Sequence, residues 1–275
     1  MNNIPADKYI MIIGAMKSGT TTLFETLSRH PAICPSHKKE PEFFSTNQWH
    51  GSDRSTYEAI FDYNPKKHKY CLEASTGYTK YPTESGVPKR IKDYGLNPFF
   101  IYCVRDPLDR MESQYNYLIT RSDQRHWLSY KIANKHTIST SMYYMQVEQY
   151  LKHFENRDRY ILVNFDDIKH NVLGVANNIC HELGLDNCLA EEPERKNKTP
   201  DTSRLEAMMM RSPVQWRKFI PLPVRQMVKK LLRRYDSDSK VYLTEAQRDT
   251  ARDRLRLDMR RFEDEFDFPV GQWGF

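Results

Sequence analysis

Short runs of apolar residues alternate with amphipathic stretches along most of this chain of 275 residues. The apolar runs predict strands at 9–14, 70–74, 98–104 and 160–165. Helical spacing predicts helices at roughly 20–29, 107–119, 142–154 and 170–183. Because the strand runs are apolar throughout, helices should cover both faces of each strand. The pattern therefore predicts an α/β fold in three layers, with a central parallel sheet.

The C-terminal part of the sequence contains the signals of one more helix. Thr244 and Gln247 have the spacing of a capping box, and the predicted helix runs from there to about Phe266. Three prolines in polar sequence predict a loop at 186–215. No repeat or second periodic core stands out, so we expect a single domain over residues 1–275.

Positive charge is concentrated in one segment. The chain contains 42 Lys and Arg against 36 Asp and Glu, but residues 195–240 alone hold 13 basic and 4 acidic side chains. Either this basic segment is a solvated amphipathic helix, or it contacts phosphate, sulfate, a membrane surface or nucleic acid. Few aromatic residues interleave it, which disfavours binding of single-stranded nucleic acid. Peripheral membrane contact through it stays open.

Apolar stretches and cysteines exclude several classes of protein. The longest nearly apolar runs, 9–16 and 98–104, fall far short of the roughly 20 residues that cross a bilayer. The N-terminus lacks the features of a secretory signal, so we expect a cytoplasmic protein. Five cysteines are widely spaced, with no CxxC pair. We therefore expect neither a disulfide framework nor a structural metal.

The first predicted strand leads through a glycine-bracketed loop into the first predicted helix. Gly14 and Gly19, two of only ten glycines, bracket this loop. Backbone N–H groups and the helix dipole there favour an anion, and the side chains that can add donors are Lys17, Ser18, Thr20 and Thr21. An ATP or GTP loop would have lysine directly after the second glycine, where this chain has Thr20. A lysine inside the loop can instead reach the bridging oxygen between a 5′-phosphate and the group being transferred.

A second candidate site follows the predicted strand at 98–104. Asp106 is a good helix N-cap and Pro107 a good first helical residue, so Arg105 should lie at the carboxyl edge of the sheet. Ligands bind at that edge in open α/β sheets. The planar guanidinium of an arginine matches a phosphate in two hydrogen bonds. Ser113 lies about two helical turns further on.

Together these motifs resemble the sulfotransferases that use 3′-phosphoadenosine 5′-phosphosulfate (PAPS). The stretch IIGAMKSGTTTL resembles their 5′-phosphosulfate loop, and Arg105 with Ser113 resembles their 3′-phosphate site. The resemblance implies a P-loop-like nucleotide-binding core and PAPS as co-substrate. It implies that Lys17 also stabilises charge on the departing phosphate. No metal is expected, because lysine and arginine supply the positive charge.

Residues 38–44 read KKEPEFF. They resemble the carbohydrate-type branch of that family, which includes heparan sulfate and related bacterial enzymes. In that branch a glutamate followed by two residues and a Phe-Phe pair is the catalytic base, which implies Glu40 here. A positioned carboxylate can remove a proton from an acceptor. Glu42 lies on the same face of an extended segment, so spacing leaves it open as the alternative. His126 and His136 belong to no recognisable motif.

Two features depart from the carbohydrate branch. Its EKTP segment corresponds to residues 73–76, which read EAST, so its active-site lysine is missing. The cysteine-bridged hairpin of the animal enzymes is also absent. We expect the basic segment, which includes Lys198 and Arg204, to form a lid over the nucleotide instead.

The predicted reaction is transfer of a sulfuryl group from PAPS to a hydroxyl or amine of an acceptor. The resemblance favours a carbohydrate or glycoconjugate, and leaves a lipid or small molecule open. One alternative is a P-loop kinase or nucleotide hydrolase, for which only residues 161–166 imitate a magnesium-binding strand end. The other is a non-catalytic protein that docks on anionic surfaces. We expect no nucleic-acid partner.

Overall fold

The five strands form one parallel sheet in the computed structural model, which describes residues 4–46, 54–120, 132–186, 189 and 240–275. The order across the sheet is β2-β3-β1-β4-β5. The strands are β1 (Tyr9–Gly14), β2 (Ile33–Pro35), β3 (Tyr70–Ala74), β4 (Phe99–Val104) and β5 (Tyr160–Asn164). Four of them were predicted from the sequence. The three-residue strand β2 was not, because so short a run has no period to recognise.

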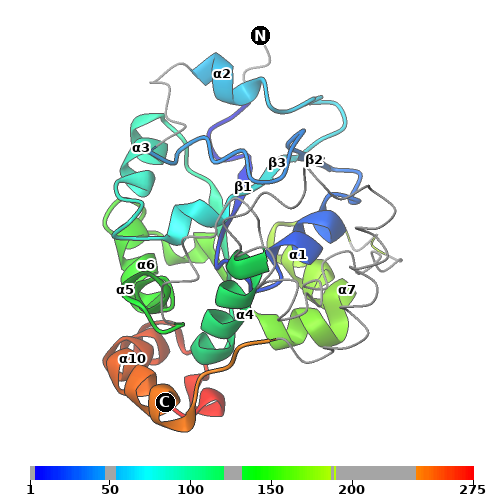
Figure 1. Cartoon of the computed structure of the whole chain (residues 1–275). Coiled ribbons are helices and arrows are strands. Elements are labelled where there is room, and N and C mark those ends of the chain that lie inside the picture. The colour runs from blue at the N-terminus through cyan, green and yellow to red at the C-terminus, as the bar shows by residue number, and fades with distance from the viewer. Residues whose placement is uncertain (1–3, 47–53, 121–131, 187–188, 190–239) are drawn as a thin grey trace, which may run out of the picture.

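Helices connect and cover the strands (Figure 1). The N-terminal ones are α1 (Thr20–Leu27), α2 (Arg54–Glu58), α3 (Val87–Asp93) and α4 (Pro107–Thr120). The later ones are α5 (Lys135–Ser139), α6 (Tyr143–Leu151), α7 (Phe165–Glu182) and α10 (Glu245–Phe266). Short 3₁₀ helices are η1 (Thr76–Thr79), η3 (Arg157–Arg159) and η5 (Val270–Trp273).

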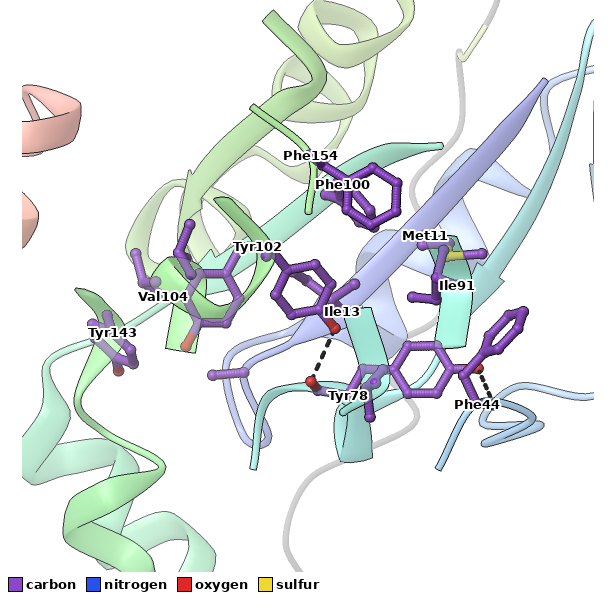
Figure 2. Packing of buried hydrophobic residues seen from close by; sticks show 14 of the residues in the cluster. Met11, Ile13, Phe44, Tyr78, Ile91, Phe100, Tyr102, Val104, Tyr143 and Phe154 are labelled. Atoms are coloured by element: carbon purple, nitrogen blue, oxygen red, sulfur yellow. Dashed lines mark hydrogen bonds between the residues drawn. The ribbon is translucent and has the colours of Figure 1, made fainter. Parts of the chain in front are cut away.

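Alternate residues of β1 pack against different helices. Tyr9, Met11 and Ile13 belong to a buried cluster with side chains of α3, α6 and α10. Figure 2 shows Met11 and Ile13 in this cluster, with Ile91 of α3 and Tyr143 of α6. Ile10 and Ile12 belong to a second cluster with side chains of α1 and α7. In Figure 1, α1 and α7 accordingly lie on one side of the sheet, and α3 and α6 on the other. The predicted α/β fold in three layers is therefore confirmed.

The long C-terminal helix α10 begins where its capping box was predicted. The Thr244 side chain accepts a hydrogen bond from the Gln247 amide, and the Gln247 side chain accepts one from the Thr244 amide. Further along, Asp258 accepts hydrogen bonds from the first amides of α6, those of Tyr144 (3.0 Å) and Met145 (2.9 Å). Asp258 thus caps α6 and joins α10 to it.

The described residues include four cysteines, all of them buried and none of them in a disulfide within that part of the chain: Cys34, Cys71, Cys103 and Cys180. No helix within the described ranges is both long and apolar enough to cross a bilayer. Most of the basic segment, including Lys198 and Arg204, lies outside the described residues. The single domain and the lid therefore stay predictions.

Candidate active site

The sheet order brings three loops to one edge. Strand β1 lies between β3 and β4, so the glycine-bracketed loop emerges between the segments that follow those two strands. The Ala15 amide donates to the Cys103 carbonyl at 2.6 Å, and the Thr79 hydroxyl donates to the Ile13 carbonyl at 2.8 Å. Strands β2 and β3 lie on one side of β1, and β4 and β5 lie on the other, so the strand order reverses at β1. Open α/β sheets bind ligands at such a switch point.

The loop after β1 is tightly turned. Gly19 has φ 82° at the start of α1, and a Cβ atom there would lie 3.0 Å from the Phe165 ring. Glycine is required at this position for both reasons. Ser18 and Thr20 are buried, whereas Thr21 is half-buried. Among the described residues the Ser18 hydroxyl has no hydrogen-bond partner.

Arg105 begins the connection from β4 to α4. Asp106 caps α4 as predicted, since its carboxylate accepts from the amides of Leu108 (2.7 Å) and Asp109 (3.1 Å). The Arg105 guanidinium lies 4.6 Å from the centre of the Phe165 ring and donates from Nη1 to the Lys17 carbonyl at 3.4 Å. Its Nε is buried without a partner in the described part of the chain. Arg105 therefore lies directly beside the loop.

Lys17 points toward helix α4. Its ammonium group lies 4.3 Å from the centre of the Tyr117 ring, a cation–π contact. Burial lowers the pKa of Lys17, the nearby charge of Arg105 lowers it further, and the charge of Glu40 opposes both. Lys17, Arg105 and Glu40 come from three separate segments, yet they are close enough to influence one another.

Helix α4 also contacts the loop after β1 through Arg110. Arg110 is fully buried and donates to the Met16 carbonyl at 3.3 Å, to Gln114 at 2.7 Å, and to hydroxyl and carbonyl groups of residues 137–141. All of these acceptors are uncharged. Ser113, one turn further along α4, is half-buried and has no hydrogen-bond partner among the described residues.

Glu40 lies at the open side of the site, with 44% of its side chain exposed. It accepts hydrogen bonds from Lys39 (2.8 Å) and from the Thr76 hydroxyl (3.2 Å). Burial raises the pKa of Glu40, but Lys39, Thr76 and the charge of Lys80 outweigh burial, so the pKa lies below its ordinary value. The carboxylate is therefore ionised at neutral pH and able to accept a proton.

Glu42 has a different environment. Its carboxylate accepts hydrogen bonds from the Gly77 amide (2.8 Å) and the Ser45 hydroxyl (2.5 Å). A Cβ atom on Gly77 would lie 2.0 Å from this carboxylate, so the two segments are in close contact. The Glu42 carboxylate thus joins two segments of the backbone, whereas the Glu40 carboxylate is close enough to Lys17 to raise the pKa of that lysine.

The other residues singled out in the sequence lie away from this cluster or outside the described residues. The ring of His136 lies 3.0 Å from the Thr83 hydroxyl, and burial lowers its pKa to about 4. Its imidazole is therefore neutral at ordinary pH. His126, Lys198 and Arg204 lie outside the described ranges. Ala74, at the position of the missing lysine, is fully buried, and Lys39 and Lys80 supply the positive charge near Glu40.

Sequence reasoning missed Phe165, Tyr117 and Thr76. Phe165 directly follows β5, at the same edge of the sheet as Arg105. Because its side chain is apolar, the sequence pattern assigned it to the end of the predicted strand at 160–165. Tyr117 lies one turn after Ser113 on α4, a spacing that could have indicated a shared face.

The donors of the site suit an anionic ligand. The Ser18 hydroxyl and Arg105 Nε are buried polar groups without partners, and such groups normally have them. Both lie among backbone amides and cations at the start of α1 and α4. Within the described ranges, no three His, Cys, Asp or Glu side chains lie close enough to hold a metal ion.

Comparison with known proteins agrees with these motifs. The chain is 27% identical over 157 residues to heparan sulfate glucosamine 3-O-sulfotransferase 5 of Homo sapiens, covering 52% of this chain and 44% of the human protein. It is 31% identical over 114 residues to membrane-associated sulfotransferase kil1 of Dictyostelium discoideum, covering 40% of this chain and 22% of that protein. The matches thus span less than half the length of these relatives.

A solved structure has the same fold. The crystal structure of a sulfotransferase from Alicyclobacillus acidocaldarius superimposes with a TM-score of 0.65 at 20% identity, covering 99% of this chain and 100% of the other. At this identity the likeness concerns the fold alone. The family model described as the sulfotransferase domain matches residues 7–263. With nearly the whole chain matched, this protein belongs to the sulfotransferase domain family.

Proposed function

We propose that this chain is a PAPS-dependent sulfotransferase, which moves a sulfuryl group to a hydroxyl or amine of an acceptor. The observation that carries the proposal is the meeting of two motifs far apart in the sequence. Arg105 Nη1 lies 3.4 Å from the Lys17 carbonyl, although 87 residues separate the two positions. One bisphosphorylated nucleotide can bridge both groups.

This geometry supports an assignment of nucleotide-binding residues. Lys17, Ser18, Gly19, Thr20 and Thr21 would bind the 5′ end of PAPS through backbone amides, hydroxyls and one ammonium group. The residues that would bind its 3′-phosphate are Arg105 and Ser113. Contacts from Lys198 and Arg204 stay predictions.

Glu40 would remove the proton of the attacking acceptor group. Its carboxylate is ionised at neutral pH, as a proton acceptor must be, and its proximity to Lys17, whose pKa the charge of Glu40 raises, supports this role. Lys17 and the loop amides would stabilise negative charge on the departing 5′-phosphate, an effect worth about 3 kcal/mol per well-placed donor. PAPS itself supplies the activated sulfuryl group, so catalysis here consists mainly of positioning and charge stabilisation.

The acceptor we propose is a carbohydrate or glycoconjugate. The arrangement of Glu40 before Phe43 and Phe44 supports it, as does the name of the human relative, a heparan sulfate glucosamine sulfotransferase. Cytoplasmic location, the absence of a nucleic-acid partner and peripheral membrane contact stay predictions. We propose no catalytic metal, because cations of the chain surround the site.

The test is an acceptor panel with labelled PAPS in the presence of EDTA. The panel contains saccharides, lipids, phenols and small amines, and mass spectrometry detects sulfated products. We expect transfer to at least one saccharide without added metal, and none of the panel members phosphorylated when ATP replaces PAPS. Phosphoryl transfer from ATP that requires magnesium would support a kinase and contradict the proposal. Absence of PAPS turnover with every acceptor class would also contradict it.

A further inference from the structure

A buried glutamate lies behind the segment that contains the candidate base. Glu73, in β3, is 1% exposed, and its carboxyl group accepts hydrogen bonds from three hydroxyls. The donors are Tyr57 (2.7 Å), Ser75 (3.1 Å) and Tyr78 (3.1 Å). No Lys, Arg or His of the described residues forms an ion pair with it. A buried carboxyl group held only by hydroxyls is costly to keep and calls for a reason.

Two of the three hydroxyls connect Glu73 to the 40–44 segment. The Ser75 hydroxyl accepts a hydrogen bond from the Glu42 amide at 3.1 Å. The Tyr78 hydroxyl accepts one from the Phe44 amide at 3.2 Å, the contact dashed beside Phe44 in Figure 2. The Tyr57 hydroxyl bonds to Glu73 alone. Glu73 therefore reaches the backbone of the base segment through Ser75 and Tyr78, but not through Tyr57.

The direction of these hydrogen bonds matters. A hydroxyl has one proton, and donating that proton to Glu73 leaves its lone pairs facing the amides. A hydroxyl that donates to a carboxyl group is also a stronger acceptor in a buried site. Glu73 thus orients and strengthens both links at once.

The base segment needs such links. Glu40 has φ 59° and Glu42 has φ 52°, left-handed conformations that side chains other than glycine adopt at a cost. Such conformations persist only where surrounding contacts determine them. The Glu40 amide donates to the Ala74 carbonyl at 2.8 Å, next to Glu73 in the chain. Without the two hydroxyl links, the Glu40 backbone could relax and its carboxylate would move.

We propose that Glu73 is a positioning residue for Glu40. Together with the hydroxyls of Ser75 and Tyr78 it holds the amides of Glu42 and Phe44, and so determines where the Glu40 carboxylate lies. This inference rests on the proposed function, because it takes Glu40 as the group that removes the acceptor proton. Glu73 does not touch the reacting atoms, and it acts through the backbone of the base segment.

The chain offers a matched pair of variants to test this. Tyr78→Phe and Tyr57→Phe each remove one hydroxyl that donates to Glu73, but only Tyr78→Phe removes an acceptor of the base segment. The first readout is the rate of hydrogen exchange of the amides in peptide 38–46, which can be measured without an acceptor. The second is kcat and KM for PAPS, with the best acceptor of the panel. The third is the Kd for adenosine 3′,5′-bisphosphate.

In Tyr78→Phe we expect faster exchange in peptide 38–46 and a kcat lowered about ten- to a hundred-fold. KM for PAPS and the nucleotide Kd should stay within about twofold, since the loop and Arg105 are untouched. Ser75→Ala and Glu73→Gln should behave like Tyr78→Phe. In Tyr57→Phe exchange and kcat should both stay within about twofold of wild type.

Two results would overturn the inference, and they are distinguishable. Equal exchange and equal kcat in Tyr78→Phe and Tyr57→Phe, with Glu40→Gln inactive, would contradict the positioning role and leave the proposed function standing. Full turnover in Glu40→Gln would contradict the role of Glu40 as base, and the positioning role with it.

Discussion

Two glutamates two positions apart have different environments in this protein. Glu40 faces Lys17 and the loop, whereas the Glu42 carboxylate is occupied by the Gly77 amide and the Ser45 hydroxyl. Their spacing in the sequence could not separate them, because an extended segment would place both on the same face. The backbone is left-handed at both residues, with φ 59° at Glu40 and 52° at Glu42, so the segment is not extended. The difference comes from the hydrogen bonds of Glu42, one to the Gly77 amide 35 positions away and one to the nearby Ser45 hydroxyl.

The first prediction compares these two residues. Glu40→Gln should lower turnover by about 10²- to 10⁴-fold, because the amide cannot accept the acceptor proton. Its Kd for adenosine 3′,5′-bisphosphate should stay within about twofold of wild type. Glu42→Gln should lose less than about tenfold in turnover but lower the free energy of unfolding by about 1 kcal/mol. The reverse ranking in a sulfuryl-transfer assay would assign the base to Glu42.

The second prediction concerns the charge of the loop. Lys17→Ala should lower kcat by about 10²- to 10³-fold, since the ammonium group stabilises the departing phosphate. Lys17→Met, which keeps the length of the side chain over the Tyr117 ring, serves as the control for packing. Steady-state kinetics in which Lys17→Met retains full kcat would show that the charge is not needed.

At the scale of elements, a side chain of one helix caps another. Asp258 in α10 accepts from two amides at the start of α6, whose own N-cap, Met142, makes no side-chain cap. The third prediction follows: Asp258→Ala should lower the free energy of unfolding by about 1–2 kcal/mol. Asp253→Ala is the control, because Asp253 lies in the same helix but is exposed and, among the described residues, pairs with Arg256 alone. Urea unfolding curves with equal shifts for both variants would contradict the cap.

Elements with a clear period or cap could be predicted from the sequence, and the others could not. The capping box of α10 and the Asp106 cap of α4 are local signals, so both helix starts are as expected. Helix α7 begins at Phe165 rather than near residue 170, because the Asn164 side chain caps it and Asn171 interrupts it with non-helical backbone. The apolar run that ends β5 continues into this first turn and hides it.

In the candidate site, too, features with local sequence signals could be predicted and contacts between distant segments could not. Motifs whose spacing is local, such as the loop at 14–21 and Arg105 with Ser113, were recognisable. Contacts between distant segments were not: Tyr117 under Lys17, Phe165 under Arg105 and Thr76 on Glu40 depend on the packing of the whole sheet. The burial of Arg110 could not be predicted either, since nothing local shows that an arginine is fully buried.

At the scale of the whole molecule, two buried carboxyl groups make stability depend on pH. Burial raises the pKa of Glu73 to about 7 and that of Asp258 to about 7, although hydrogen bonds to each oppose burial. In the unfolded chain such groups titrate near pH 4. The folded chain therefore binds more protons between these values. The stability that each group contributes is fully present below about pH 4 and is lost as the pH rises through about 7.

The fourth prediction is that raising the pH from 6 to 8 lowers the free energy of unfolding by about 1 kcal/mol for each of these groups. Urea unfolding at both pH values measures this. In Glu73→Gln, which does not titrate, the loss should be smaller by about that amount. An identical pH dependence in wild type and Glu73→Gln would show that Glu73 does not titrate in this range.

The central claim is that the loop after β1 and the residues after β4 bind opposite ends of one nucleotide. The most direct test is the affinity of the chain for adenosine 3′,5′-bisphosphate and for adenosine 5′-phosphate, measured by calorimetry in EDTA. Wild type should prefer the bisphosphate by about a hundred-fold, and Arg105→Ala should reduce that preference to below about tenfold. Equal affinity of wild type for the two nucleotides, or an unchanged preference in Arg105→Ala, would contradict the account.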